Sequence, residues 1–218
     1  MPTESSHHVP DGEIPDGMSP DARDTWPHPA LIDSWLGDAE IDFEFRPGED
    51  VAVQDDPEAR AAARRFRDVL GTFASGITVI TTVSNGEPIG MTCQSFSSVS
   101  LDPPLVLFVP ARSSRAWPVI QRTGRFCVNV LAADQEHVSG QLASKGADKF
   151  AGIKWRPAEV TGSPIIDGSL AHLDCTIHTV HEGGDHYVVV GRVEHLATTV
   201  GDVTEPLLYY RGRYRTTD

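Results

Sequence analysis

The chain of 218 residues carries 31 acidic and 18 basic side chains, which gives a formal net charge of −13. This charge excludes nucleic acid as an expected partner, because the phosphate backbone repels acidic proteins. No apolar run reaches the roughly 18 to 20 residues of a membrane-spanning helix. The first twenty residues also lack the basic and apolar regions of an export signal, so we expect a cytoplasmic protein without membrane contact.

Acidic residues and prolines are concentrated in the first quarter of the chain. Residues 1–60 hold 16 acidic and 3 basic side chains, whereas the remainder is balanced. Such a segment cannot bury enough apolar surface to offset the entropy of ordering. We therefore predict a largely irregular extension over residues 1–56 and one domain over residues 57–218. Within the extension, the apolar-rich Trp26–Leu36 either docks on the folded body or a partner subunit, or belongs to a flexible tail.

The domain is predicted to begin with a helix and a β-hairpin. Asp56-Pro57-Glu58 combines an N-cap, a proline at the first helical position and an acid in the first turn. An apolar stripe of helical spacing follows at Phe66, Val69, Leu70 and Phe73. The β-branched residues 77–83 predict a strand. Asn85-Gly86 directly after them predicts a tight hairpin turn.

Short strands dominate the rest of the domain. The predicted strands cover residues 89–92, 95–100, 105–109, 126–131, 173–180 and 187–196, and the predicted helices cover residues 115–123 and 134–144. Many short strands with few helices favour an antiparallel barrel that is mainly β with flanking helices. No G-x-G-x-x-G motif follows a strand, so a Rossmann domain has no support.

The densest functional signal is the segment Pro88–Leu105. Gly90 allows a ligand or another backbone to approach closely. Small hydrogen-bonding side chains cluster around it at Thr92, Gln94, Ser95, Ser97 and Ser98. Such a segment can surround a polar ring system and a phosphate. The alternative is an edge strand rich in Ser and Thr that faces water.

Further segments are candidates for binding anions or rings. Ser113-Ser114-Arg115 precedes a helix, where free N–H groups and a guanidinium bind anions, although a serine cap explains the same serines. Lys149 is either a second cation of this site or a surface lysine. Gly183–His186 predicts a turn that presents His186 at a barrel rim. Pro206–Tyr214 holds three tyrosines and two arginines, which either stack on a ring or close the barrel.

Other chemistries have little support. The three cysteines, Cys93, Cys127 and Cys175, show no C-x-x-C spacing, so we expect buried free thiols. Cys93 has no assigned base that would make it a nucleophile, and no elbow motif indicates a serine hydrolase. The histidines near the C-terminus lack an accompanying carboxylate pattern, so no metal site is predicted.

Several short motifs follow one another in order along residues 66–214. They are Phe66-Arg67, Gly76–Thr82, Gly90–Thr92, Ser95-Phe96, Ser98–Leu107, Phe126–Leu131, Asp148–Phe150, Gly183–His186 and Leu207–Gly212. Together they resemble the short-chain flavin reductases, which are the FMN-binding split-barrel partners of two-component flavin-dependent monooxygenases. Within that family, Ala151–Pro157 and Gly162–Ile166 are most similar to the reductase component of the actinobacterial secosteroid-phenol hydroxylase.

The resemblance implies an antiparallel FMN-binding split β-barrel that forms a homodimer, with the flavin in a groove partly formed between subunits. The implied flavin contacts are Pro88, Ile89, Gly90, Met91, Thr92, Gln94 and Ser95 for the ring and ribityl chain, Val109, Pro110 and Ala111 along the ring, Arg115 and Ala116 at the phosphate, and Gln141 and Leu142 closing the pocket. The implied catalytic residue is His186. It would receive the nicotinamide nucleotide together with Tyr209, Tyr210, Arg211 and Gly212.

The resemblance also implies an activity. The chain is expected to be an NAD(P)H:flavin oxidoreductase that transfers hydride from NADH or NADPH to FMN or FAD, and supplies diffusible reduced flavin to a separate monooxygenase. Because the cofactors supply this chemistry, the protein has to align them and needs no nucleophile of its own. Two alternatives stay open: a non-catalytic barrel that stores or senses flavin, and an interaction subunit whose working surface is the acidic extension.

Overall fold

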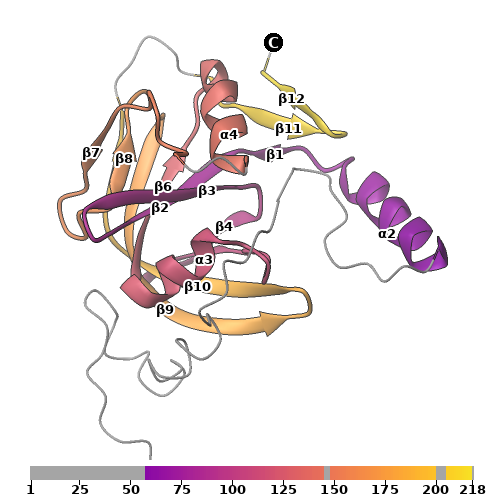
Figure 1. The fold of residues 1–218 in the computed structure, drawn as a ribbon, viewed down its shortest axis with the longest axis horizontal. Coiled ribbons are helices and arrows are strands. Elements are labelled where there is room, and N and C mark those ends of the chain that lie inside the picture. The colour runs from indigo at the N-terminus through magenta and orange to yellow at the C-terminus, as the bar shows by residue number, and fades with distance from the viewer. Residues whose placement is uncertain (1–56, 145–147, 200–204, 218) are drawn as a thin grey trace, which may run out of the picture.

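The computed structural model describes residues 57–144, 148–199 and 205–217 (Figure 1). The predicted extension of residues 1–56, with Trp26–Leu36, lies outside the described residues. The described part begins with helix α2 (Pro57–Leu70), at the position of the predicted N-terminal signal. None of the described helices combines the length and apolarity needed to cross a membrane.

The main sheet contains seven strands, and every neighbouring pair is antiparallel. Its strands are β2 (Thr78–Ser84), β3 (Glu87–Cys93), β4 (Phe96–Leu101), β5 (Pro104–Phe108), β6 (Arg125–Val130), β9 (Ala171–Gly183) and β10 (His186–Thr198). They are ordered β3-β2-β6-β9-β10-β5-β4. The antiparallel, mainly β prediction is thereby confirmed. The two edge strands β3 and β4 are consecutive in the chain, yet hydrogen bonds do not close the sheet between them.

The hairpin turns lie where the sequence predicts them. Asn85 and Gly86 adopt φ values of 52° and 81°, so the β2–β3 turn has the two left-handed positions that Asn-Gly favours. Strands β9 and β10 form a long hairpin that turns at Gly184, where φ is 73°. This second turn holds His186 as the first residue of β10.

Two small sheets were not predicted. One contains β1 (Ser75–Gly76), β11 (Leu208–Tyr210) and β12 (Arg213–Arg215), and the other contains β7 (Trp155–Pro157) and β8 (Pro164–Ile166). Strands of two or three residues are too short for a visible alternation of polar and apolar side chains. In the first sheet, Ser75 is paired with Tyr209, which brings the C-terminal tyrosines to the end of α2.

Two helices cover opposite faces of strand β2. They are α3 (Ala116–Thr123) and α4 (Glu136–Ala143), the latter preceded by the 3₁₀ turn η2 (Ala133–Gln135). Trp117 of α3 belongs to the same buried cluster as Ile80, whereas Leu142 of α4 belongs to a second cluster with Val79. Because successive strand residues point to opposite faces, β2 contributes to both cores. This explains why its first five residues are all buried.

Helix α2 buries none of its residues. Its predicted apolar stripe is present but lies open: Phe66 is 66% exposed, Val69 61% and Leu70 54%, and Phe73 just beyond the helix is 79% exposed. Figure 1 shows α2 standing away from the main sheet. An amphipathic helix gains most of its stability by packing its apolar face, so this face lacks the cover that such helices normally have.

Candidate functional site

A cavity of about 670 Å³ lies where β3, β4 and the start of α3 meet the C-terminal tyrosine segment. This volume falls within the roughly 300 to 1,000 Å³ that is typical of small-molecule sites. Among the predicted site residues, those on its wall are Met91, Thr92, Gln94, Ser95, Val109, Ala111, Arg115, Ala116, Leu142, His186, Tyr209, Arg211 and Gly212. The structure therefore brings together residues from most of the segments that the sequence singled out.

Six predicted site residues are not on the wall: Pro88, Ile89, Gly90, Pro110, Gln141 and Tyr210. Gly90 shows why. A Cβ atom built on Gly90 would lie 3.2 Å from Cζ of Phe150, so the buried Phe150 ring occupies the space beside this glycine. The cavity begins one residue later, at Met91. The expectation of a ligand crevice around Gly90 is therefore replaced by a crevice between Met91 and Ser97.

Three of the other residues that are not on the wall contact wall residues or their neighbours. The Gln141 Nε2 amide donates hydrogen bonds to the carbonyls of Lys149 (3.1 Å) and Ala151 (2.7 Å), which ties this loop to the end of α4. The Pro110 carbonyl accepts a 3.0 Å hydrogen bond from the Tyr187 backbone N–H. The Tyr210 ring lies beneath the Arg211 guanidinium, whose carbon is 5.3 Å from the ring centroid.

One end of the cavity is cationic. Arg115, at the start of α3, and Lys149 both lie on the wall. Burial lowers the pKa of Lys149, and the positive charge of Arg115 lowers it further. Two cations that repel each other beside a helix N-terminus make a site that an anion stabilises. Ser114 Oγ accepts a 3.3 Å hydrogen bond from the Trp117 N–H, so this serine satisfies one backbone donor in the first turn of α3, whose N-cap residue is Arg115.

Charge on the wall is of one sign. The wall carries Arg67, Arg115, Lys149 and Arg211, and no Asp or Glu is found among the described residues that form it. The acidic excess of the chain lies within residues 1–60, and the remainder is balanced, so the wall is a local separation of charge within the domain. A cationic pocket in an acidic protein concentrates anionic ligands.

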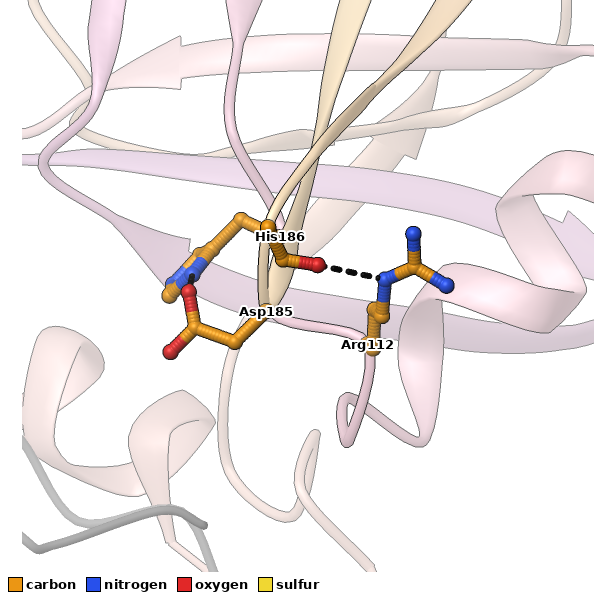
Figure 2. Close-up of polar contacts among 4 residues, drawn as sticks. Arg112, Asp185 and His186 are labelled. Carbon is orange, nitrogen blue, oxygen red and sulfur yellow. Dashed lines mark hydrogen bonds and ion pairs between the residues drawn. The ribbon is translucent and has the colours of Figure 1, made fainter. Parts of the chain in front are cut away.

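His186 lies on the wall, at the first residue of β10. Figure 2 shows the Asp185 carboxylate beside the ring of His186. The Nδ1 atom of the ring is 2.7 Å from Oδ1 of Asp185. This hydrogen bond lowers the pKa of Asp185. Because an ionised carboxylate only accepts hydrogen bonds, the proton of the pair resides on Nδ1. Asp185 thus fixes the tautomer and orientation of the His186 ring.

Cys93 also lies on the wall, but its thiol is not suited to nucleophilic chemistry. Burial raises the pKa of Cys93 to about 11, and only the thiolate is a good nucleophile. No group of three metal-ligating side chains occurs in the part of the chain that the structure describes. The wall therefore offers donors, cations and apolar surface to a ligand that brings its own chemistry.

Four further wall residues, Ser97, Ser113, Ser114 and Lys149, were candidates in the sequence as donors or as a cation. The wall residues that the sequence did not single out as site residues are Phe66, Arg67, Leu70, Gly71 and Phe73 from α2 and its end, together with Ser75, Cys93, Phe96, Leu107, Ala143 and Ser144. The α2 residues carried no such signal, because an apolar helical stripe normally indicates packing against a core.

Comparison with known proteins gives the site its context. The protein-family model of the flavin reductase like domain matches residues 70–218 of this chain. The reductase subunit HsaB of a flavin-dependent monooxygenase from Mycobacterium tuberculosis is 57% identical over 156 residues, which cover 72% of this chain and 83% of the relative.

Solved structures agree with this match. Nitrilotriacetate monooxygenase component B from Mycobacterium thermoresistibile is 55% identical and superposes with a TM-score of 0.71, covering 73% of this chain and 88% of the other. The NADH:FAD oxidoreductase SgcE6 of Streptomyces globisporus, solved with NAD and FAD fragments, is 38% identical with a TM-score of 0.66, covering 75% of this chain and 96% of the other.

Proposed function

The chain belongs to the flavin reductase like family and is an NAD(P)H-dependent flavin reductase, and on that premise we propose that the cavity holds flavin and nicotinamide side by side. When bound, the nicotinamide supplies the hydride that the flavin accepts. The protein contributes binding and alignment. The single observation that carries the proposal is a cavity of about 670 Å³ with cations at one end and His186 on its wall.

The flavin phosphate is assigned to the cationic end. Burial, and after it the charge of Arg115, lowers the pKa of Lys149, and a phosphate between the two cations would favour the charged lysine. The N-terminus of α3 adds backbone N–H groups and a positive dipole end. This donor set fits a phosphate and has no carboxylate on the wall to oppose it.

The flavin ring is assigned to the crevice between β3 and β4. Gln94, Ser95 and Ser97 offer exposed polar groups there, while Val109 and Ala111 offer apolar surface. A flat ring with polar edges requires this combination. Thr92 contributes differently, because its hydroxyl already donates a 2.6 Å hydrogen bond to the Ser139 carbonyl. We assign Thr92 to holding α4 against β3.

The nicotinamide nucleotide is assigned to His186 and the segment Tyr209–Gly212, which lie on the same cavity wall. The Nδ1 proton of His186 is held by Asp185. This arrangement fixes the imidazole ring so that it can support a second ring against the flavin. Such alignment at contact distance is the main contribution a protein can make to hydride transfer.

This enzyme supplies reduced flavin to a partner monooxygenase. The relative HsaB is named as the reductase subunit of such a monooxygenase. We further propose that the chain forms a homodimer through the open stripe of α2. Phe66, Leu70 and Phe73 are exposed and also lie on the cavity wall. Cover by a second copy would bury this apolar surface and narrow the mouth of the cavity.

The catalytic assignment is tested by following NADH oxidation with added FMN or FAD and comparing the wild-type enzyme with His186→Ala. We expect hydride transfer to slow about 10- to 100-fold, as misalignment of reacting groups commonly causes, while the FMN Kd changes little. An unchanged rate of hydride transfer would show that His186 is misassigned. Absence of NADH oxidation by the wild-type enzyme would favour a flavin-storage protein.

The dimer is tested by sedimentation equilibrium of Phe66→Asp/Leu70→Asp. A buried unpaired carboxylate is costly, so we expect this variant to be monomeric. Val160→Asp is the matched control, because Val160 is 59% exposed and lies away from the cavity. A dimeric double variant would refute the assignment of this stripe.

A further inference from the structure

We propose that Arg112 is a positioning residue that holds the Gly183–His186 turn against the cavity. The proposal rests on the proposed role of His186. Arg112 does not lie on the cavity wall. It follows Ala111 and precedes Ser113, both of which do. It therefore stands between the segment assigned to the phosphate and the turn assigned to the nicotinamide.

Four contacts join Arg112 to both arms of the turn. Its Nε donates a 2.8 Å hydrogen bond to the Gly184 carbonyl, drawn in Figure 2. Its Nη2 lies 3.3 Å from a carboxylate oxygen of Glu182. Its guanidinium carbon is 4.7 Å from the centroid of the Tyr187 ring. Its backbone N–H donates a 2.9 Å hydrogen bond to the Asp185 carbonyl.

The sequence favours a turn here, but nothing in it restrains the turn to one conformation. Residues 181–185 are exposed. Two adjacent glycines precede Asp185, and Gly184 adopts a φ of 73°. Glycine leaves the backbone many conformations in the absence of other restraints. Anchoring the Gly184 carbonyl removes this freedom next to the Asp185–His186 pair.

The contribution of Arg112 is geometric more than energetic. The side chains of Arg112 and Glu182 are 41% and 79% exposed, and exposed ion pairs add little stability. If the side chain is removed, two backbone hydrogen bonds remain on either side of the bridge between Ala111 and His186: from the Tyr187 N–H to the Pro110 carbonyl, and from the N–H of residue 112 to the Asp185 carbonyl. The hairpin should therefore stay paired while the turn loosens.

Lysine cannot replace this arginine. A guanidinium is planar, so it can stack on an aromatic ring while its Nε and Nη2 atoms donate in two directions. An ammonium group can approach Glu182 or the Gly184 carbonyl, but it cannot hold both while lying flat on Tyr187. Rescue by lysine should consequently be poor, although the charge is conserved.

The experiment compares Arg112→Ala and Arg112→Lys with the wild-type enzyme by stopped-flow bleaching of bound flavin on mixing with NADH. We expect Arg112→Ala to slow hydride transfer and raise the KM for NADH by about tenfold, with an FMN Kd within about twofold and an unchanged far-UV spectrum. Arg112→Lys should recover little of the loss. Arg122→Ala is the control, because Arg122 is an exposed arginine of α3 away from the cavity wall.

A double variant separates positioning from a general structural role. If Arg112 acts through His186, adding Arg112→Ala to His186→Ala should cause no further loss of hydride-transfer rate. Full additivity would overturn the proposal, as would normal NADH kinetics in Arg112→Ala or a matching loss of FMN affinity. A wild-type enzyme without NADH oxidation would instead refute the proposed function before Arg112 is tested.

Discussion

Lys149 is the residue at which the proposed phosphate end of the site is best tested. Burial and the charge of Arg115 lower its pKa, so it loses its proton at a lower pH than a free lysine does. We expect Lys149→Ala to weaken FMN binding about 10- to 100-fold, the loss of one charged hydrogen bond, with riboflavin binding nearly unchanged. In the wild-type enzyme, the preference for FMN over riboflavin should fall as pH rises through the lowered pKa of Lys149. Fluorescence titration measures both.

Lys154→Ala is the matched control for this experiment, because Lys154 is exposed and does not lie on the cavity wall. It should bind FMN as the wild-type enzyme does. Equal loss of FMN and riboflavin affinity in Lys149→Ala would show that this lysine supports the fold of the loop and does not bind the phosphate.

Cys93 gives a second prediction at the level of a single residue. Because burial raises its pKa to about 11, the thiol is protonated at pH 8. The native enzyme should resist alkylation by iodoacetamide at this pH, whereas all three cysteines should react after denaturation. Intact-mass measurement over time checks this. Rapid labelling of Cys93 in the native enzyme would contradict it.

Individual site residues differed in how well the sequence could predict them. Arg115 and His186 lie on the cavity wall, and each belongs to a local signal that the sequence shows, a helix start and a glycine turn. Gly90 was misplaced relative to the cavity because Phe150, which occupies the adjacent space, is sixty residues away in the chain. A contact between distant segments leaves no trace in the spacing of either one. The same reason explains why Phe66 was not expected on the cavity wall.

At the level of elements, strand β10 depends on a glycine for its packing. A Cβ atom on Gly191 would lie 2.3 Å from Cζ of the fully buried Phe126. Phe126 cannot retreat easily, because its ring packs on Phe108 with 4.9 Å between centroids. We expect Gly191→Ala to lower the free energy of unfolding by about 1 to 3 kcal/mol, as overpacking of cores does. Calorimetry would show a lower Tm.

Gly140→Ala is the control of opposite sign. Apart from its chain neighbours and the nearby backbone of α4 itself, no atom lies within 4 Å of a Cβ built on this glycine. Alanine is favoured over glycine inside a helix by up to about 1 kcal/mol. This variant should therefore be at least as stable as the wild-type enzyme. A Gly191→Ala variant of wild-type stability would show that the β10–β6 contact can relax.

The sequence predicted the elements that are long enough to carry a recognisable pattern within their own residues. The run before Asn85-Gly86 predicted β2, and Pro118 correctly limited the start of α3, where it occupies the first turn. The short strands β1, β7, β8, β11 and β12 were missed. Strand β1 has only two residues, and its pairing with β11 depends on segments more than 130 residues apart. No local pattern encodes such a pairing.

At the level of the whole molecule, the acidic extension and the catalytic domain should be separable. Residues 66–212 provide every described residue on the cavity wall, whereas the excess of acidic side chains lies within residues 1–60. We expect deletion of residues 1–56 to leave the rate of NADH oxidation with added flavin within about twofold of the full chain. Steady-state assays with matched flavin concentrations measure this. A large loss of activity would show that the extension contributes to the site.

The effect of the same deletion on assembly carries separate information. If α2 forms the interface, the shortened chain should sediment as the full chain does. Dissociation of the shortened chain would show that Trp26–Leu36 packs between subunits.

The gap between β3 and β4 has a consequence for how product leaves the enzyme. Residues of both edge strands lie on the cavity wall, and Gln94 and Ser95 connect the two strands across this gap. A molecule seated there can depart sideways without any ladder of backbone bonds being broken. An enzyme whose product must reach another protein benefits from such an unobstructed exit. If the proposed flavin site is correct, we therefore expect reduced flavin to leave the enzyme after each turnover.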